Sequence, residues 1–327
     1  MKNFKRILMW FVVIVFVLIT ATLSYIKLAL PNVGPPPDLK VERTPERVAR
    51  GEYLANHVAV CIDCHSRRDW SRFSGPPTEG TFGMGGDCFD QKFGFPGVYF
   101  AKNITPSGIS RYTDGELFRV ITTGVNKEGE AMFPVMPFHY YGQMDEEDIK
   151  SIIAYIRTLK PIENVVPKST SDFPMNFILN TIPHKGQPTK RPENSDVLNY
   201  GKYLTNAASC IDCHTKFDKG SLVQGTEYGG GREFPFPDGA VVRSGNISSD
   251  KETGIGNWKK ETFIALFHAH ADSATLHTTL KPGDFNSIMP WTMYGKMNDE
   301  DLGAIFAYLQ SVPAVTNRVE KFTAAKK

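Results

Sequence analysis

The longest apolar stretch of this chain lies near its N-terminus. It covers residues 7–25 and follows the basic residues Lys2, Lys5 and Arg6. Its length is typical of a membrane-spanning helix and exceeds the apolar core of most signal peptides. Because the basic residues come first, the positive-inside rule places the rest of the chain outside the cytoplasm. We expect residues 1–30 to be an uncleaved membrane anchor, and a cleaved signal peptide is the alternative.

A proline-rich spacer, residues 31–43, separates this apolar stretch from the first amphipathic pattern. Thr44 is a typical helix N-cap, and Pro45 suits the first helical position. The pattern that follows predicts a helix over residues 47–59.

Two further helices are marked by their caps. Thr113 and Glu116 form a capping box that opens a helix ending near Gly124. Asp145 is the N-cap of the next helix, which we expect to end at Pro161. The apolar positions of this second helix recur at helical spacing: Ile149, Ile152, Ile153 and Ile156.

The pattern then repeats. Much of the second half aligns with the first at a constant offset of 153 residues, which indicates an internal duplication. Examples are Pro137 and Pro290, Tyr141 and Tyr294, Asp148 and Asp301, and Tyr155 and Tyr308. We expect one domain over 44–160, a linker over 161–193 with six prolines, a second domain over 194–315, and a tail over 316–327.

Four of the five cysteines lie in two identical strings, C-I-D-C-H, at residues 61–65 and 210–214. C-x-x-C-H is the attachment signature of a c-type haem. Two thiols on one turn can each bond a vinyl group of one porphyrin, and the next histidine lies below the iron. A zinc knuckle or a redox dithiol is the alternative for one copy, but a structural zinc site needs four ligands. We predict two covalent haems c, bound by Cys61, Cys64, His65, Cys210, Cys213 and His214.

Two methionines are candidates for the sixth iron ligand. Met136 and Met289 each precede a proline, occupy equivalent places in the repeat, and follow the haem histidine by 71 and 75 residues. A thioether ligand suits electron transfer, whereas an open position suits ligand binding or peroxide chemistry. We therefore predict iron ligation by His65 and Met136 in one unit and by His214 and Met289 in the other.

Other side chains could compete for the sixth position. Met132 and Met293 have no equivalent methionine in the repeat, and we expect Met144 and Met297 to be core residues. A bis-histidine haem or a surface metal site is possible in the second unit, which is longer between Asn246 and Met289, 43 residues against 33. The histidines concerned, for which solvated positions near a helix end are the simpler interpretation, are His268, His270 and His277.

Three further residues, two asparagines and a cysteine, have structural interpretations. Asn103 and Asn246 are equivalent in the repeat, and we expect each to fix a loop through backbone or haem propionate bonds. The fifth cysteine, Cys88, is interpreted as a small buried apolar residue rather than a reactive thiol.

Composition adds limits on compartment and partners. The net charge of +2 gives no broad basic surface for nucleic acid. Haem attachment to such thiols takes place outside the cytoplasm, so the chain must be exported.

The motifs taken together resemble a known family, the membrane-anchored multihaem cytochrome c subunits of bacterial alcohol, aldehyde and gluconate dehydrogenases. The matching pieces are R-G-E-Y-L at 50–54, both C-I-D-C-H strings, N-I-T-P at 103–106, G-I-G-N-W at 254–258, both M-P pairs, and Y-G-x-M-x-x-E-D before the last helix of each unit. The resemblance implies histidine–methionine haems and electron transfer from a catalytic partner towards quinone or a later acceptor. Members of the family typically carry three haem units and often a C-terminal membrane attachment.

The sequence therefore predicts a mainly α protein with two tandem class I-type cytochrome c domains after an N-terminal transmembrane helix. We expect it to carry electrons in a periplasmic respiratory chain, at the inner membrane, without catalytic residues of its own. The expected partners are a dehydrogenase or quinol-side donor, and an oxidase or soluble cytochrome acceptor. A dihaem enzyme such as a cytochrome c peroxidase is the alternative, and it would need one displaceable sixth ligand.

Overall fold

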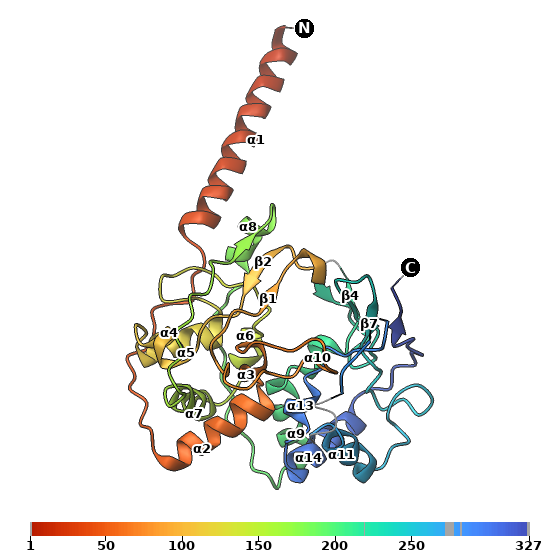
Figure 1. Ribbon diagram of the computed structural model, residues 1–327. Coiled ribbons are helices and arrows are strands. Elements are labelled where there is room, and N and C mark those ends of the chain that lie inside the picture. The colour runs from red at the N-terminus through yellow and green to blue at the C-terminus, as the bar shows by residue number, and fades with distance from the viewer. Residues whose placement is uncertain (1, 219, 272–277, 282, 326–327) are drawn as a thin grey trace.

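The computed structural model describes residues 2–218, 220–271, 278–281 and 283–325. Helix α1 (Lys2–Leu28) extends away from a mostly helical body (Figure 1). Its segment Asn3–Leu28 is long and apolar enough to cross a membrane, and its most apolar window is fully exposed. By length and composition this helix fits a membrane anchor or a signal sequence.

A crossed pair of helices builds the first unit. Helix α2 (Pro45–Tyr53) begins at the predicted cap, where Thr44 Oγ1 accepts a hydrogen bond from the backbone N–H of Arg47. It packs against α7 (Glu146–Ile156). The crossing is so close that a Cβ on Gly51 would lie 1.8 Å from the carbonyl oxygen of Ser151. Glycine is therefore required at this position of α2.

The helix predicted over residues 47–59 differs from the observed one. Regular α-helix ends at Tyr53, and Leu54–Val58 continue as a π-helical turn, η1. This wider turn immediately precedes the first haem motif, and its residues Leu54 and Val58 are fully buried.

The second unit has the same helix pair. Helix α9 (Val197–Ala207) packs against α14 (Asp299–Ser311), and a Cβ on Gly201 would lie 2.0 Å from the carbonyl oxygen of Ala304. The α2–α7 and α9–α14 pairs lie beside each other at one end of the body (Figure 1). Their buried side chains form one continuous core.

The remaining helices are short. Helix α5 (Asp114–Thr123) has the predicted capping box of Thr113 and Glu116 and ends at Gly124. Helix α7 ends at Ile156, earlier than the predicted Pro161, where the backbone N–H of Arg157 closes the last turn. The others are α3 (Cys61–Cys64), α4 (Pro106–Ile109), α6 (Phe138–Tyr141), α8 (Met175–Ile178), α10 (Cys210–Cys213), α11 (Lys260–His268) and α13 (Trp291–Tyr294), with 3-10 turns η2 (Gln91–Phe93) and η3 (Leu179–Thr181).

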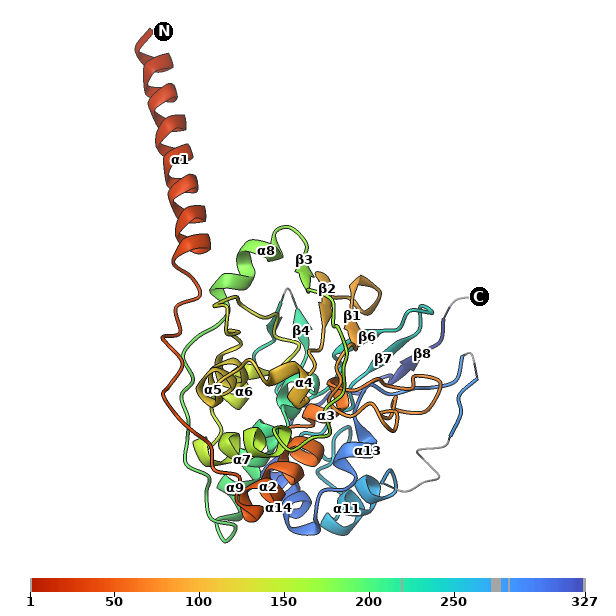
Figure 2. The ribbon, with the colours of Figure 1, turned by 60° about the vertical axis from the view of Figure 1, so that its left-hand side comes forward.

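Small antiparallel sheets, which the sequence analysis did not foresee, accompany the helices. In the first unit, β2 (Gly97–Phe100) lies between β1 (Cys88–Phe89) and β3 (Thr170–Ser171). In the second, β7 (Val241–Arg243) lies between β6 (Glu233–Pro235) and β8 (Phe322–Thr323), and β4 (Phe217–Asp218) pairs with β5 (Ser221–Leu222) (Figure 2). Cys88 is half-buried in β1, opposite Phe100.

These sheets cross the expected domain boundaries. Strand β3 belongs to the expected linker, yet Val98 pairs with Thr170 in the first unit. Strand β8 belongs to the expected tail, yet Val242 pairs with Phe322 in the second unit. A boundary at residue 160 therefore separates β3 from its sheet, and a boundary at residue 315 separates β8 from its sheet.

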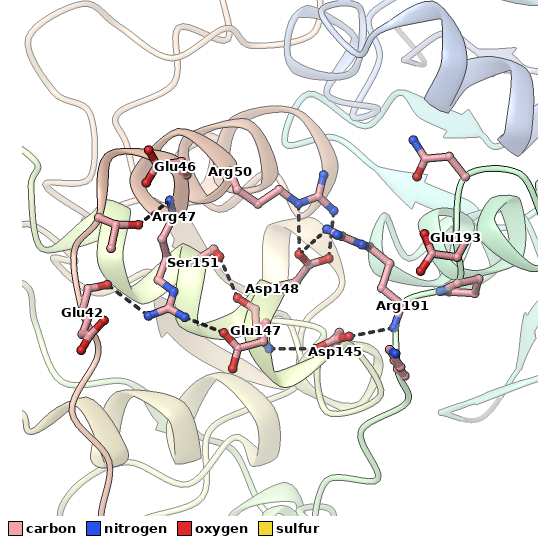
Figure 3. Close-up of a pocket in the computed structure, with 14 residues that line it drawn as sticks. Glu42, Glu46, Arg47, Arg50, Asp145, Glu147, Asp148, Ser151, Arg191 and Glu193 are labelled. Carbon is pink, nitrogen blue, oxygen red and sulfur yellow. Dashed lines mark hydrogen bonds and ion pairs between the residues drawn. The ribbon is translucent and has the colours of Figure 1, made fainter.

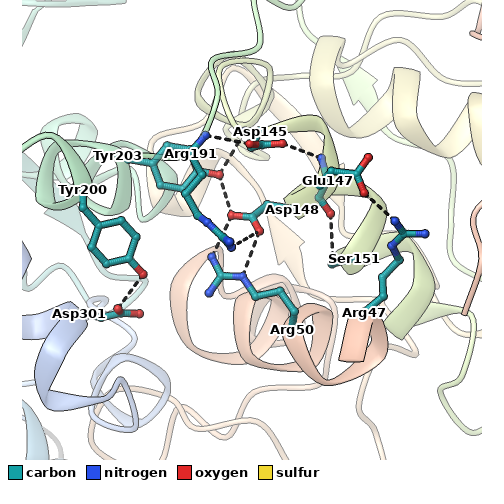
Figure 4. A network of polar contacts seen from close by, with 10 residues as sticks. All are labelled: Arg47, Arg50, Asp145, Glu147, Asp148, Ser151, Arg191, Tyr200, Tyr203 and Asp301. Atoms are coloured by element: carbon teal, nitrogen blue, oxygen red, sulfur yellow. Dashed lines mark hydrogen bonds and ion pairs between the residues drawn. The ribbon is translucent and has the colours of Figure 1, made fainter. Parts of the chain in front are cut away.

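Reciprocal hydrogen bonds join the two units, and Figure 4 shows the one between Tyr203 and Asp148. The hydroxyl of Tyr53, on α2, donates to Asp301 of the second unit at 2.6 Å. The hydroxyl of Tyr203, on α9, donates to Asp148 of the first unit at 2.8 Å. Since Tyr53 and Tyr203 recur in the repeat, each unit contributes the same tyrosine to the other unit's carboxylate.

Candidate functional site

Each haem motif begins at a residue in the left-handed region of the backbone. Val60 has φ 45° and Ser209 has φ 55°, and each is the N-cap of the short helix that carries the two cysteines. Left-handed backbone is uncommon for residues other than glycine, above all for a β-branched one such as Val60. The same strained turn thus presents both pairs of thiols.

All four motif cysteines are free and half-buried. Burial raises the pKa of Cys61, Cys64 and Cys210 to about 12 and that of Cys213 to about 11. Two free thiols on a single turn fit attachment to two vinyl groups of one porphyrin.

The histidines of the two motifs are oriented in the same way. The Nδ1 atom of His65 lies 2.6 Å from the carbonyl oxygen of Lys102, and that of His214 lies 2.7 Å from the carbonyl oxygen of Gly245. Because a carbonyl oxygen can only accept, Nδ1 carries the proton and Nε2 keeps its lone pair for a metal. Burial lowers the pKa of both histidines, which favours the neutral imidazole that ligates iron.

An asparagine directly follows each residue that provides an accepting carbonyl, and its side chain bonds the surrounding loop. In the first unit, Asn103 Oδ1 accepts from the N–H of Thr105 at 2.9 Å, and its Nδ2 donates to the carbonyl oxygen of Ile162 at 2.8 Å. In the second, Asn246 Oδ1 accepts from the N–H of Ser248 at 3.0 Å. The loop-fixing role expected of both asparagines is confirmed, and each adjoins the carbonyl that orients a haem histidine.

The predicted sixth ligands lie on equivalent loops. Met136 precedes α6, and Met289 precedes α13. Five residues after each methionine, a tyrosine returns to the haem motif: Tyr141 donates to the carbonyl oxygen of Ala59 at 2.8 Å and Tyr294 to that of Ala208 at 2.9 Å. Both accepting residues lie two positions before the first motif cysteine, so each methionine loop is tied to the motif of its own unit.

The competing side chains have other surroundings. Met144 and Met297 are each 1% exposed and belong to the core, as expected. His268 uses both ring nitrogens, since Nδ1 bonds the carbonyl oxygen of Gly295 at 2.8 Å and Nε2 bonds Asp299 at 2.7 Å.

The other competitors lie elsewhere in the second unit. The His270 ring packs on Phe73 and Trp291, and Met293 is buried in α13. His277 lies outside the described residues.

Sequence reasoning missed an ion pair beside each motif. Asp63 pairs with Arg68 at 3.2 Å, and Asp212 pairs with Arg232 at 3.0 Å. Burial raises the pKa of Asp63 to about 6, although the Arg68 guanidinium opposes that rise. The aspartate that recurs inside both C-I-D-C-H strings was the feature of the sequence that could have indicated these ion pairs.

An open polar cleft lies apart from these motifs, beside α2 and α7 (Figure 3). Its charged side chains pair with one another: Arg47 with Glu147, and both Arg50 and Arg191 with Asp148. None of the predicted haem-binding residues lines it. The cleft belongs to the junction between the units, not to the haem chemistry.

Comparison with known proteins also indicates a similarity to cytochromes c. Residues 198–313 match the family described as cytochrome c. The chain is 29% identical over 310 residues to the fructose dehydrogenase cytochrome subunit of Gluconobacter japonicus, covering 90% of this chain and 59% of that one. It is 24% identical over 284 residues to the cytochrome c subunit of the quinone alcohol dehydrogenase of Gluconobacter oxydans, covering 82% and 55%.

A third relative has a more similar length. The dihaem c-type cytochrome of Cereibacter sphaeroides is 25% identical over 276 residues, covering 82% of this chain and 86% of that one. By contrast, the chain spans little more than half the length of the fructose and alcohol dehydrogenase subunits.

Proposed function

We propose that this chain, a cytochrome c homologue related to the cytochrome subunits of fructose, alcohol and gluconate dehydrogenases, is a dihaem electron-transfer protein. The observation that carries the proposal is the repeated geometry. Each unit combines two free thiols, a histidine whose Nδ1 faces a carbonyl, and a methionine loop tied to the haem motif. Its haem units comprise about residues 44–171 and 194–323, each completed by its last strand.

Each haem would be held by residues from its own unit. Cys61 and Cys64 would bond the first porphyrin, with His65 and Met136 as the iron ligands. The second set is Cys210, Cys213, His214 and Met289. When bound, a haem c supplies a one-electron iron couple, and a methionine ligand raises its potential. The carbonyls of Lys102 and Gly245 fix the orientation of the imidazole rings, as hydrogen-bond partners of metal-ligating histidines do.

The proposed partners follow from the relatives. Two of these relatives are cytochrome subunits of dehydrogenases, so the proposed donor is a dehydrogenase or a quinol-side protein. The proposed acceptor is an oxidase or a soluble cytochrome. A second candidate, a dihaem peroxidase, would require a sixth ligand that leaves the iron.

The N-terminal helix is proposed to remain as a membrane anchor, with the haem units in the periplasm. Contacts between its last turn and the body support retention. Lys27 Nζ donates to the carbonyl oxygen of Asn176 at 3.0 Å and lies 5.0 Å from the centre of the Phe177 ring. Asn180 Nδ2 donates to the carbonyl oxygen of Ile26 at 3.1 Å. Intact-protein mass measurement on the membrane fraction tests this, because cleavage of a signal peptide would remove N-terminal residues and lower the mass.

Haem stoichiometry tests the attachment sites. We expect the purified protein to exceed the polypeptide mass by two haems, and the variant with Cys210→Ala and Cys213→Ala by one. Retention of two haems in that variant would refute the assignment.

Ligand substitution tests the sixth position and separates carrier from enzyme. We expect Met136→His to lower the midpoint potential of one haem and Met289→His that of the other, because imidazole favours ferrous iron less than a thioether does. The wild type should bind carbon monoxide poorly. Rapid peroxide turnover by the wild type would favour the peroxidase instead.

A further inference from the structure

The loop after the first haem motif is longer than its counterpart. Both loops return to their histidine, since the N–H of Gly85 bonds the carbonyl oxygen of His65 and that of Gly230 bonds the carbonyl oxygen of His214. The return takes 20 residues in the first unit and 16 in the second. The additional residues lie in a segment that contacts the second unit.

This segment, residues 71–74, lies along the extra residues of the second unit. The N–H of Phe73 donates to the carbonyl oxygen of Thr278 at 3.2 Å, and the N–H of Leu280 donates to the carbonyl oxygen of Ser71 at 2.9 Å. The two places where the units differ in length therefore contact each other. The segment ends at Ser74.

Ser74 makes three hydrogen bonds to the second unit. Its Oγ donates to the carbonyl oxygen of Met289 at 2.5 Å and accepts from the N–H of Trp291 at 3.1 Å. Its backbone N–H donates to Oδ1 of Asn286 at 2.9 Å. The residue is 1% exposed and has φ 66°, a left-handed conformation that serine seldom adopts.

The first unit's methionine loop is not held in this way. The N–H of Phe138 bonds the carbonyl oxygen of Met136 at 2.8 Å, the local turn that Trp291 and Met289 also form at 2.7 Å. Among the described residues, no hydrogen bond from the second unit reaches the backbone of Met136 or Phe138. The second unit reaches this part of the first only further along, where Asn206 Nδ2 donates to the carbonyl oxygen of Tyr140 at 3.2 Å. The bond from Ser74 to the ligand residue itself therefore has no counterpart at Met136 among the described residues.

We infer that Ser74 is a positioning residue of the first unit that holds Met289 as the sixth ligand of the second haem. The inference rests on the proposed function, in which Met289 is that ligand. A hydrogen bond to the carbonyl of the ligand residue restrains the backbone that directs its sulfur. Without this bond the sulfur leaves the iron more often, so external ligands bind the second haem more readily and its midpoint potential falls.

The test uses Ser74→Gly in the full-length haem-loaded protein. Glycine accepts the left-handed backbone without strain, so this change removes the Cβ and the hydroxyl and leaves the backbone conformation favourable. We expect the apparent affinity of the second haem for imidazole to rise by a factor of roughly three to ten or more, because both hydrogen bonds of the Ser74 hydroxyl are lost. Spectroelectrochemical titration should show a lower midpoint for that haem and an unchanged midpoint for the first.

Ser71→Ala is the matched control in the same segment. The Ser71 side chain bonds Asp69 at 2.5 Å, and the carbonyl oxygen that receives the N–H of Leu280 is retained in alanine. We expect wild-type imidazole affinity and wild-type midpoints. Asn286→Ala keeps the Ser74 hydroxyl and removes the third bond, together with the bond that Asn286 Oδ1 accepts from the N–H of Ser287 at 2.7 Å. It should change the second haem in the same direction as Ser74→Gly.

The outcomes separate this inference from the proposed function. Unchanged imidazole affinity and midpoints in Ser74→Gly would overturn the inference, and equal shifts at both haems would also overturn it. If Ser74→Gly does not load with haem, Asn286→Ala decides in the same way. If Met289→His itself leaves both midpoints unchanged, the ligand assignment fails, whatever Ser74→Gly does.

Discussion

The two haem units share their inner geometry and differ where they meet. Both have the glycine-dependent helix crossing, the histidine–carbonyl pair and the tyrosine tie to the methionine loop. At the junction, Asp148 accepts from Arg50, Arg191 and Tyr203, whereas Asp301 accepts from Tyr53 and Tyr200. The Asp148 carboxylate thus has two guanidinium partners and one hydroxyl partner, whereas the Asp301 carboxylate has two hydroxyl partners.

This difference shows which parts of a duplicated unit can diverge. Under the proposed function, the contacts around each haem motif serve the same kind of cofactor. The junction has no such requirement, because its two sides face different neighbours. We therefore expect equivalent substitutions to have matching effects near the motifs and unequal effects at the junction.

The largest difference is expected from the two junction aspartates. Asp148→Asn leaves two guanidinium groups at a buried site without their counter-charge, which costs about 3–5 kcal/mol for a buried pair. The cost should lie at the lower end, since the Arg191 side chain is 42% exposed. Asp301→Asn should cost about 1.5–3 kcal/mol, because only hydrogen bonds to a charged acceptor weaken. Urea unfolding followed by circular dichroism measures both, and equal losses would contradict the comparison.

The helix crossings should behave alike in the two units. Gly51→Ala and Gly201→Ala each place a Cβ against a backbone carbonyl, and overpacking of this kind costs about 1–3 kcal/mol or more. Gly303→Ala is the control within α14, where a Cβ would lie 3.4 Å from the Lys260 side chain. We expect it to be neutral or to stabilise by up to about 1 kcal/mol. Thermal unfolding monitored by haem absorbance distinguishes these results, and an unaffected Gly201→Ala protein would disprove the equivalence.

Substitutions at helix N-caps are expected to change the stability by an intermediate amount, and in opposite directions in the two units. Thr113 caps α5 with a full capping box. The N-cap residue of α11 is Lys259, and its side chain makes no capping hydrogen bond. Thr113→Ala should destabilise by about 1 kcal/mol, and Lys259→Ser should stabilise by a similar amount, because its backbone is already extended. Denaturation midpoints measure both changes. A loss of stability in Lys259→Ser would show that the lysine has another role.

The smallest effect is a pH dependence confined to the second unit. Hydrogen bonds to Asp299 and to the carbonyl oxygen of Gly295 raise the pKa of His268 above its usual value of about 6.5. Its stabilisation is therefore complete below pH 6.5 and is lost as the pH rises through the raised pKa. The pair is exposed, so less than about 1 kcal/mol is expected. Stability curves of the wild type and His268→Gln should converge at alkaline pH, and parallel curves would count against this pair.

Local sequence signals predicted much of the site. The motif spacing predicted the haem-binding thiols and histidines, and the caps at Thr44, Thr113 and Asp145 placed three helix starts correctly. Such signals work because capping and haem attachment involve residues within one helical turn of each other. The repeat extended the same reasoning to Met136 and Met289 as candidates for the sixth position.

By itself, the sequence thus determined the haem motifs, the duplication and the apolar N-terminal helix. The tertiary structure alone decided which carbonyl orients each histidine, since Lys102 follows His65 by 37 residues and Gly245 follows His214 by 31. It also brought Ser74 to Met289, 215 residues away. These partners are chosen by which helix faces and loops pack together, because burying the shared apolar core fixes the relative placement of distant segments.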